Sequence, residues 1–495
     1  MRTPLTQGRP GSGNDTRGRA RAWLPGGPDA GISSKPDRWA AVAAFALVAA
    51  AVLVGAALGW AGHPVHAPAA PLFAHVMPHV GPGTPFAVII AIIVITRGPA
   101  LAARLPWRRL LLAGWLASVA WTFALALVDG WQRGVAGRLT TPFEYLSEVP
   151  RVTDARAMLR GFTDHILLFS PDNWAEHVSA HPPGVLLVFV GLDRLGLHGG
   201  GWAGAFCILV GALATAAVAV TLRALGDEEA ARTAVPFLVL FPGAVWVGVS
   251  ADGMFMGVAA SALALLAVGL TRPSRWCAAL GGALLAGCVY LSYGLILLVL
   301  PAGAVIVAAR TRRWPMLAWA VLGAGVVVGS FTWLGFEWWE GYRLVKIRYY
   351  QGLATARAYS YWVWGNLAAL AVSAGPAAGP ILRRAVVRLA AVTRNRTGDP
   401  APARARFRAL VPARIDVRLG AARMAPALLC LGGIAAAVAA DLSGLSKAEV
   451  ERIWLPFAIW LPAAAALLPE SDRRGWLWLQ AGTALLVNHL VLTNW

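Results

Sequence analysis

Two carboxylates in one polar segment could do acid–base chemistry. Glu144 and Glu148 are four residues apart, so they would share one face of a helix, with Arg151 close behind. A positioned carboxylate can act as a general base by removing a proton from an attacking hydroxyl group. Carboxylates beside a membrane are also commonly just solvated. The residues alone leave open this alternative and the choice between Glu144 and Glu148.

The same segment continues to Trp174, His177 and His181. His181 opens the sequence His-Pro-Pro-Gly, and proline is favoured in the first turn of a helix. The N-terminus of such a helix attracts phosphate, although these four residues also suit a helix start with no further role. Four histidines between His63 and His79 have no carboxylate or cysteine among them. Their spacing does not define a metal site, and the metal requirement stays open.

Asp252 and the pair Glu451–Arg452 place charge where apolar runs begin. An unpaired carboxylate in hydrocarbon costs a few kcal/mol, so Asp252 is a candidate functional residue. It could also be the N-cap of the helix that follows. Arg452 could bind an anion, or it could simply extend its charged end to the membrane surface.

Residues 337–360 alternate tyrosines with cations. The cations are Arg343, Lys346, Arg348 and Arg357. On the outer side of a membrane they would break the tendency of Lys and Arg to remain cytoplasmic. Such cations need an anionic partner, and a lipid headgroup or a phosphodiester is the natural one. Membrane lipids are therefore an expected partner.

The composition predicts an all-α integral membrane protein. Of 495 residues, 58% are hydrophobic and 14% are charged, against about 25% charged in soluble domains. The apolar runs must be helices because hydrocarbon offers no hydrogen bonds to the backbone. The net charge of +19 could suggest nucleic-acid binding. However, seven basic residues fall within 1–38 and eleven arginines within 383–423, as expected for cytoplasmic segments, so we expect no nucleic acid.

The apolar runs predict a polytopic bundle of 13 spans in one domain, residues 39–493. The spans are expected at 39–61, 84–104, 108–130, 201–224, 231–249, 251–271, 275–290, 292–310, 314–336, 361–381, 424–441, 453–469 and 474–493. The basic distribution then makes residues 1–38 a disordered cytoplasmic tail and 382–423 a cytoplasmic Arg-rich loop, with the loops 131–200 and 337–360 outside.

One apolar run, residues 182–197, is expected not to cross. It is short and contains Asp193 and Arg194. If it crossed, the arginines at 310–313 and the Arg-rich loop would both lie outside. A juxtamembrane helix on the outer face is the cheaper solution.

Three motifs in order, Glu144-Tyr145, His181-Pro182-Pro183 and Asp252-Gly-Met-Phe255, resemble those of the GT-C glycosyltransferases. This superfamily includes protein O-mannosyltransferases, lipid A aminoarabinose transferases and mycobacterial-type mannosyl- and arabinofuranosyl-transferases. The sequence departs from the pattern in having Glu144 where an aspartate is usual, and in two extra spans before the catalytic loop.

The resemblance implies an inverting glycosyltransferase in the plasma membrane, with its active site on the outer face. The donor would be a polyprenyl-monophosphate sugar, and the acceptor a glycan, lipid or protein of the cell envelope. Glu144 or Glu148 would be the base, and Asp252 would position a substrate or bind a divalent cation if one is used. His181, Arg343, Lys346, Arg348 and Arg452 would bind the donor phosphate, and Tyr145, Trp174, His177 and Glu451 the sugar or acceptor.

Two other classes compete with this hypothesis. A transporter or flippase of lipid-linked saccharides would place its polar residues near the bilayer midplane, in broken helices. A non-catalytic scaffold would need no polar cluster. The polar residues are expected along one face of the membrane, which favours the enzyme.

Overall fold

The computed structural model describes residues 34–309, 314–397 and 424–493, with backbone alone for 393–397. Three sequence predictions lie wholly or partly outside these residues. They are the disordered tail over 1–33, the arginines at 310–313 and residues 398–423 of the Arg-rich loop.

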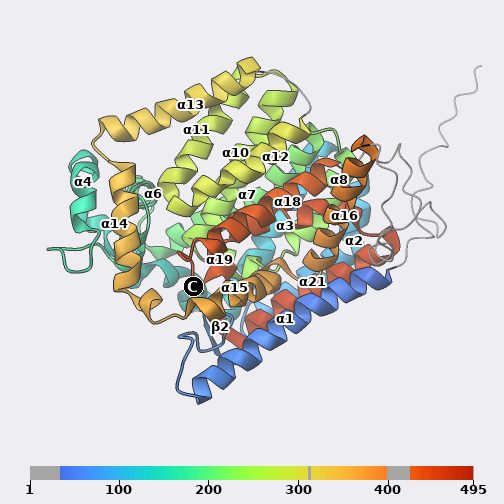
Figure 1. Ribbon diagram of the computed structural model, residues 1–495, viewed down its shortest axis with the longest axis horizontal. Coiled ribbons are helices and arrows are strands. Elements are labelled where there is room, and N and C mark those ends of the chain that lie inside the picture. Colours follow the sequence, from blue (N-terminus) through green and yellow to red (C-terminus); the bar gives the residue numbers. More distant parts are fainter. Residues whose placement is uncertain (1–33, 310–313, 398–423, 494–495) are drawn as a thin grey trace, which may run out of the picture.

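The described chain is built of helices, with one short strand pair (Figure 1). The longer helices are α1 (Lys35–Trp60), α2 (Thr84–Arg104), α3 (Trp107–Ala126), α7 (Gly200–Ala224), α8 (Glu228–Val239), α10 (Ala251–Thr271), α11 (Arg275–Leu291), α12 (Val299–Ala308), α13 (Trp314–Trp333), α14 (Trp338–Gln351), α15 (Tyr359–Ala374), α16 (Ala378–Thr397), α18 (Met424–Leu442) and α21 (Glu470–Leu490).

Short elements join the long helices. They are α4 (Ala155–Gly161), α5 (Glu176–Ala180), α6 (Gly184–Arg194), α9 (Ala244–Val247), α19 (Val450–Ile453) and α20 (Leu455–Ala458), with the tight helical turns η1 (Leu127–Asp129), η2 (Gln132–Ala136), η3 (Arg138–Thr140), η4 (Tyr145–Ser147), η5 (Val149–Arg151), η6 (Phe162–His165), η7 (Tyr293–Leu298), η8 (Leu353–Thr355) and η10 (Pro462–Leu467). Strands β1 (Ala74–Val76) and β2 (Val491–Thr493) pair antiparallel, with Ala74 opposite Thr493.

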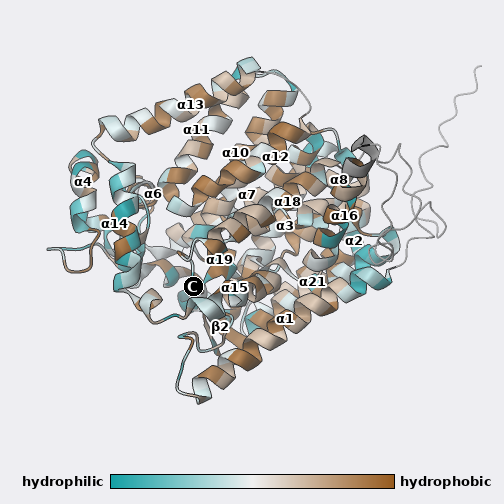
Figure 2. Ribbon diagram, in the orientation of Figure 1, coloured by the Kyte–Doolittle hydropathy of each residue, from teal (hydrophilic) through white to brown (hydrophobic). Residues whose placement is uncertain are grey.

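Seven described helices are long and apolar enough to cross a membrane: α1, α2, α3 with η1, α7, α10, α13 and α18. The pair α15 and α16 would add an eighth, although its two halves are bent by 102°. In Figure 2, apolar residues recur along the ribbons of these helices. The chain is therefore a multi-pass α-helical membrane protein.

The remaining predicted spans are shorter or broken, so the count of 13 stays a prediction. The run 231–249 breaks after α8, where Pro242 follows, and the run 453–469 divides into α19, α20 and η10 around Pro456 and Pro462. Pro456 and Pro462 stand in the first turns of α20 and η10, where a proline needs no partner for an N–H group, and Pro242 lies between α8 and α9. The run 361–381 bends at Gly375, whose φ of +83° suits glycine.

Helix α10 lies at the centre of the bundle, between α7 and α11, and most of its residues are buried. Small residues allow the close approach. A Cβ added at Gly257 would lie 1.9 Å from the carbonyl oxygen of Val210. By contrast, α1 and α13 bury few residues, as expected for helices at a lipid-facing rim.

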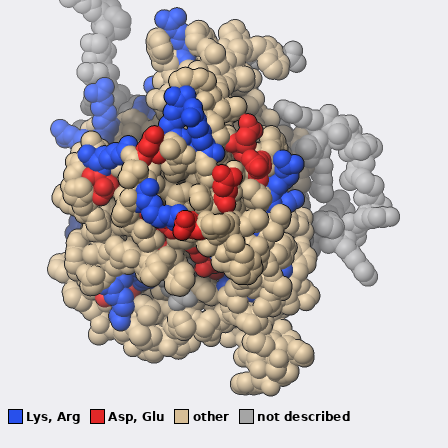
Figure 3. All heavy atoms as spheres, turned by 90° about the vertical axis from the view of Figure 1, so that its left-hand side faces the viewer, with Lys and Arg blue, Asp and Glu red and all other residues tan. Residues whose placement is uncertain are grey.

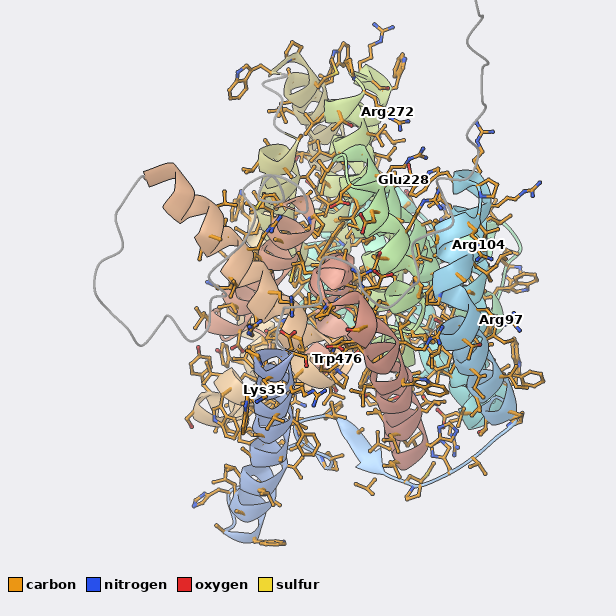
Figure 4. The ribbon with its side chains drawn as sticks, turned by 90° about the vertical axis from the view of Figure 1, so that its right-hand side faces the viewer. Lys35, Arg97, Arg104, Glu228, Arg272 and Trp476 are labelled. Atoms are coloured by element: carbon orange, nitrogen blue, oxygen red, sulfur yellow. The ribbon has the colours of Figure 1, made fainter. Side chains whose placement is uncertain are left out.

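The loop segments 131–200 and α14 gather at one end of the molecule, on the left of Figure 1, which we call the site end. Acidic and basic side chains are interleaved on this face in Figure 3. Figure 4 shows the opposite side, the far end, with Lys35, Arg104 and Arg272. Helix α10 begins at the site end and finishes beside Arg272, so the two ends are separated by the length of a span.

The run 182–197 forms α6, whose 11 residues measure about 16 Å. That length cannot cross about 30 Å of hydrocarbon. Gly184 lets the helix start against α11, since a Cβ there would lie 2.4 Å from the Tyr290 carbonyl oxygen. The placement of α6 on the outer face stays a prediction.

Thiol labelling tests which way the bundle faces. In a Cys277→Ser background, Leu195→Cys at the exposed end of α6 should react with a membrane-impermeant maleimide added to intact cells. Arg272→Cys, exposed at the far end, should react only after the membrane is opened. The reverse pattern would place the site end in the cytoplasm.

Candidate functional site

Glu144 is held in the site by His177. The carboxylate lies just before η4 and is 4% exposed, and its Oε1 is 2.8 Å from Nδ1 of His177 on α5. The other imidazole nitrogen, Nε2, is 3.3 Å from Nη2 of Arg452. Arginine can only donate, so Nε2 accepts and the proton of a neutral His177 is on Nδ1. His177 therefore donates a hydrogen bond to Glu144 and sets its orientation.

Arg452 joins this pair to two further carboxylates. Its Nη1 lies 2.5 Å from Oδ2 of Asp252, in the first turn of α10, and its Nη2 lies 2.9 Å from Oε2 of Glu449. Glu449 also pairs with Arg357 at 3.1 Å. We call the connected residues, Glu144, His177, Arg452, Asp252, Glu449 and Arg357, the buried network. It contains three carboxylates and two guanidinium groups.

The charges of the network support one another. Burial would lower the pKa of Arg452, but the attraction of Asp252 and Glu449 outweighs this and places the pKa above its usual value. Burial would likewise raise the pKa of Glu449, but Arg452 and Arg357 lower it below its usual value. Both residues are therefore ionised at neutral pH. Removing one partner of such a buried pair costs about 3–5 kcal/mol because the other charge is left uncompensated.

The two candidate bases differ in what their oxygens contact. Glu148 receives Arg151 Nη1 at 2.6 Å on Oε2 and the backbone N–H of Ala175 at 2.8 Å on Oε1. Glu144 has a partner on Oε1, while its buried Oε2 has no hydrogen-bond partner among the described residues. Glu144 thus has an oxygen available for chemistry, and Glu148 ties the loop together.

Tyr145 and His181 form a second, neutral pair beside the network. The carbonyl of His177 lies 2.8 Å from Nδ1 of His181 and can only accept, so Nδ1 carries the proton. The Tyr145 hydroxyl is 3.2 Å from the same nitrogen. Burial lowers the pKa of His181 to about 4. The Nδ1–H of His181 is thus engaged by the His177 carbonyl, and its role in binding the donor phosphate stays a prediction.

Two other predicted site residues, Trp174 and Arg452, have partners within the protein. Trp174 does not face the network: its indole N–H donates to the carbonyl of Phe162 at 3.0 Å, and Arg151 lies 4.5 Å above its ring. It therefore packs the loop, and its contact with a sugar stays a prediction. The guanidinium of Arg452 is engaged by Asp252 and Glu449, which makes it the hub of the network, and its predicted contact with a phosphate stays a prediction.

The basic–aromatic segment separates into exposed and buried cations. Arg343 and Lys346 on α14 are exposed, and Lys346 lies 5.5 Å from the Tyr342 ring centre. Arg348 is 9% exposed, and its Nε has no hydrogen-bond partner among the described residues. Burial lowers its pKa, while Glu176 next to His177 partly opposes this. Helix α14 packs against α5, and the charge of Glu176 on α5 acts on Arg348.

Glu451 is fully buried next to the hub but belongs to a different contact. Its Oε1 accepts the backbone N–H of Phe73 at 2.8 Å, and its Oε2 has no partner within the described part of the chain. Burial raises its pKa to about 7. The contact with Phe73 anchors the 61–83 loop and does not bring Glu451 to Glu144.

Sequence reasoning missed Glu449 and the role of Arg357 within the site. The spacing of Glu449 and Arg452, three residues apart, was the available signal for a pair. Nothing local indicated that Arg452 would meet Asp252, 200 residues away. Among the described residues no three His, Cys, Asp or Glu side chains form a group that could hold a metal ion. His79 instead contacts Asp129 at 3.0 Å.

The helices and the network define a polytopic α-helical membrane protein with a buried polar site at one end of the bundle. No protein-family model matches the chain, and no curated protein matches its sequence.

Glu451 should make the stability depend on pH near neutrality. Its folded-state pKa of about 7 exceeds the usual 4.5. Its contribution to the free energy of unfolding is therefore complete below about pH 4.5 and is lost as the pH rises through 7. This contribution is on the order of 3 kcal/mol at most. Glu451→Gln should make the thermal unfolding midpoint nearly independent of pH between pH 5 and 8. Exposed Glu340→Gln is the control, and an unchanged profile in Glu451→Gln would contradict the assignment.

Proposed function

We propose that this protein is an inverting glycosyltransferase that moves a sugar from a polyprenyl-monophosphate donor to a hydroxyl group of a cell-envelope acceptor. One observation supports this most. A buried glutamate, Glu144, has one oxygen oriented by His177 and the other without a partner among the described residues, and it connects through Arg452 to Asp252. A base held this way suits removal of a proton from an acceptor hydroxyl.

In the proposed reaction the acceptor oxygen attacks the anomeric carbon and its proton passes to Oε2 of Glu144. The bond from the anomeric carbon to the donor phosphate breaks, and the phosphate leaves with the electron pair on the opposite face, which inverts the configuration. Arg348, the buried α14 cation beside α5, would meet the growing phosphate charge. Asp252 acts through Arg452 by keeping His177 and Glu144 in place.

The depth of the network suits a lipid-linked donor. Asp252 lies in the first turn of α10, whose 21 residues extend about 30 Å to the far end. This equals the thickness of the hydrocarbon core, so the network lies near a membrane boundary, where a polyprenyl phosphate has its headgroup.

We further propose that the site end faces outward from the plasma membrane. The far end carries Arg104 and Arg272 (Figure 4), as the positive-inside tendency expects of a cytoplasmic side. Several site-end cations are instead paired with carboxylates, as Arg151 is with Glu148 and Arg138 with Asp129.

Transport of a lipid-linked saccharide is the alternative function, and one observation favours it. Two segments within the bundle, α8–α9 and α19–α20–η10, are broken and almost fully buried, as in the discontinuous helices of transporters. Purified protein in liposomes discriminates the two functions. A transferase yields a new glycosidic product from a polyprenyl-phosphate sugar and an acceptor, whereas a transporter moves the saccharide across the bilayer without product.

Glu144→Gln should remove turnover and leave donor binding intact. The amide cannot accept the proton, so the rate should fall about 10²–10⁴-fold. Membranes assayed against a panel of polyprenyl-phosphate sugars provide the rate, and binding of the active donor provides the second readout. Glu148→Gln is the matched control: its effect should appear in stability. Full activity in Glu144→Gln would end the general-base assignment.

Arg348→Ala should weaken donor binding while Arg343→Ala does not. A lost charge-assisted bond to phosphate is worth about 1.5–3 kcal/mol, or tenfold or more in affinity. Exposed Arg343 on the same helix is the matched control for charge. Equal effects of the two variants on the apparent donor affinity would mean a diffuse electrostatic effect without a specific contact.

A further inference from the structure

Two consecutive residues beside the network have a backbone conformation that L-amino acids rarely adopt. Ala448 has φ of 70° and Glu449 has φ of 64°, both in the left-handed region. A non-glycine residue with positive φ is uncommon, and such residues persist only where their surroundings hold them in place. Here the strained pair comes directly before α19.

This conformation determines where Arg452 lies. The carbonyl of Glu449 accepts the backbone N–H groups of Arg452 at 3.2 Å and Ile453 at 3.1 Å, which starts α19. The Glu449 side chain then pairs with the Arg452 guanidinium. A relaxed backbone at Ala448 and Glu449 would turn α19 and withdraw Arg452 from Asp252 and His177.

Asn366 on α15 holds the strained pair from the other side. The residue is 2% exposed, and its Oδ1 accepts the backbone N–H of Ala448 at 3.1 Å. Its Nδ2 donates to Oδ1 of Asp441 at 2.8 Å and to the carbonyl of Ser446 at 2.7 Å. One amide thus spans the whole turn from the end of α18 to the start of α19, with both donor hydrogens in use.

The same turn also holds α14. The backbone N–H of Lys447 donates to the Tyr349 hydroxyl at 2.7 Å, and Lys447 Nζ donates to the carbonyl of Ala354 at 3.1 Å. Arg348 is next to Tyr349 on α14. The turn therefore connects the residues around the base with the helix that carries Arg348.

We propose that Asn366 is a positioning residue for the reaction: it keeps Ala448 and Glu449 in the left-handed conformation and thereby holds Arg452 against Asp252 and His177. The effect on catalysis rests on the proposed function. The conformational part does not, because it concerns only the turn and α19.

Glycine provides the test, since it adopts positive φ without a Cβ clash. Asn366→Ala should reduce kcat/KM about tenfold or more, as expected for buried hydrogen bonds left unmade. Adding Ala448→Gly should restore most of this loss. Ala439→Gly within α18, at an ordinary helical conformation, is the matched control and should restore none. A residue that merely packs would not be rescued by glycine at 448.

Hydrogen–deuterium exchange supplies a readout that needs no substrate. Residues 441–453 should exchange faster in Asn366→Ala and regain protection in the double variant. If exchange behaves so but no donor supports transfer, the proposed function fails and the conformational part stands. If exchange in Asn366→Ala is unchanged, or glycine at 448 rescues neither readout, the proposal is overturned. Asn366→Ser is used in the same way if Asn366→Ala does not fold.

Discussion

The ion pair between Arg452 and Asp252 is the interaction on which the site depends. Both residues are almost fully buried, and each alone would carry a large desolvation cost. Their partners make the arrangement tolerable: Arg452 also meets Glu449 and His177, and His177 meets Glu144. One guanidinium thus joins the loop after α3, the start of α10 and the turn before α19. Because Arg452 can only donate, it makes Nε2 of His177 the acceptor and leaves the proton on Nδ1. His177 then donates this proton in its hydrogen bond to Glu144 and orients the carboxylate.

The network is short of positive charge, which has a chemical consequence. Three carboxylates face two guanidinium groups, and Oε2 of Glu144 has no hydrogen-bond partner among the described residues. The next cation, Arg348, lies on a separate helix and is buried without an ion pair in the described chain. A hydroxyl group that donates to Oε2 of Glu144 and an anion that pairs with Arg348 would together satisfy both residues. This imbalance distinguishes the site from the self-contained clamp at the far end, where Asp37 is paired with Arg383 and Arg384.

Broken helices lie where the site needs irregular backbone. The segments around Pro242 and Pro456 are enclosed by protein, as the membrane demands of backbone groups that leave a helix. One of them begins with α19, directly after the strained pair Ala448–Glu449. This turn positions the Glu449 carboxylate and, through the start of α19, the Arg452 guanidinium. A continuous span through this region would keep helical dihedrals at Ala448 and Glu449 and would point Arg452 elsewhere. The irregular backbone and the buried network therefore coincide.

The amino-acid sequence by itself determined the class of protein and the neighbourhood of the site. Long apolar runs can only be helices in hydrocarbon, and the spacing of Glu144, His177 and His181 placed them in one polar segment. The tertiary structure decided the rest. Pro242, Pro456 and Pro462 permit breaks, but only packing determines which apolar runs are single spans. Glu144 and Glu148 look alike in sequence, but their contacts differ. Ala175 and Arg151 donate to both oxygens of Glu148, whereas His177 contacts only one oxygen of Glu144. The partner of Arg452 was beyond local patterns, since periodicity relates residues within a few turns and Asp252 is 200 positions away.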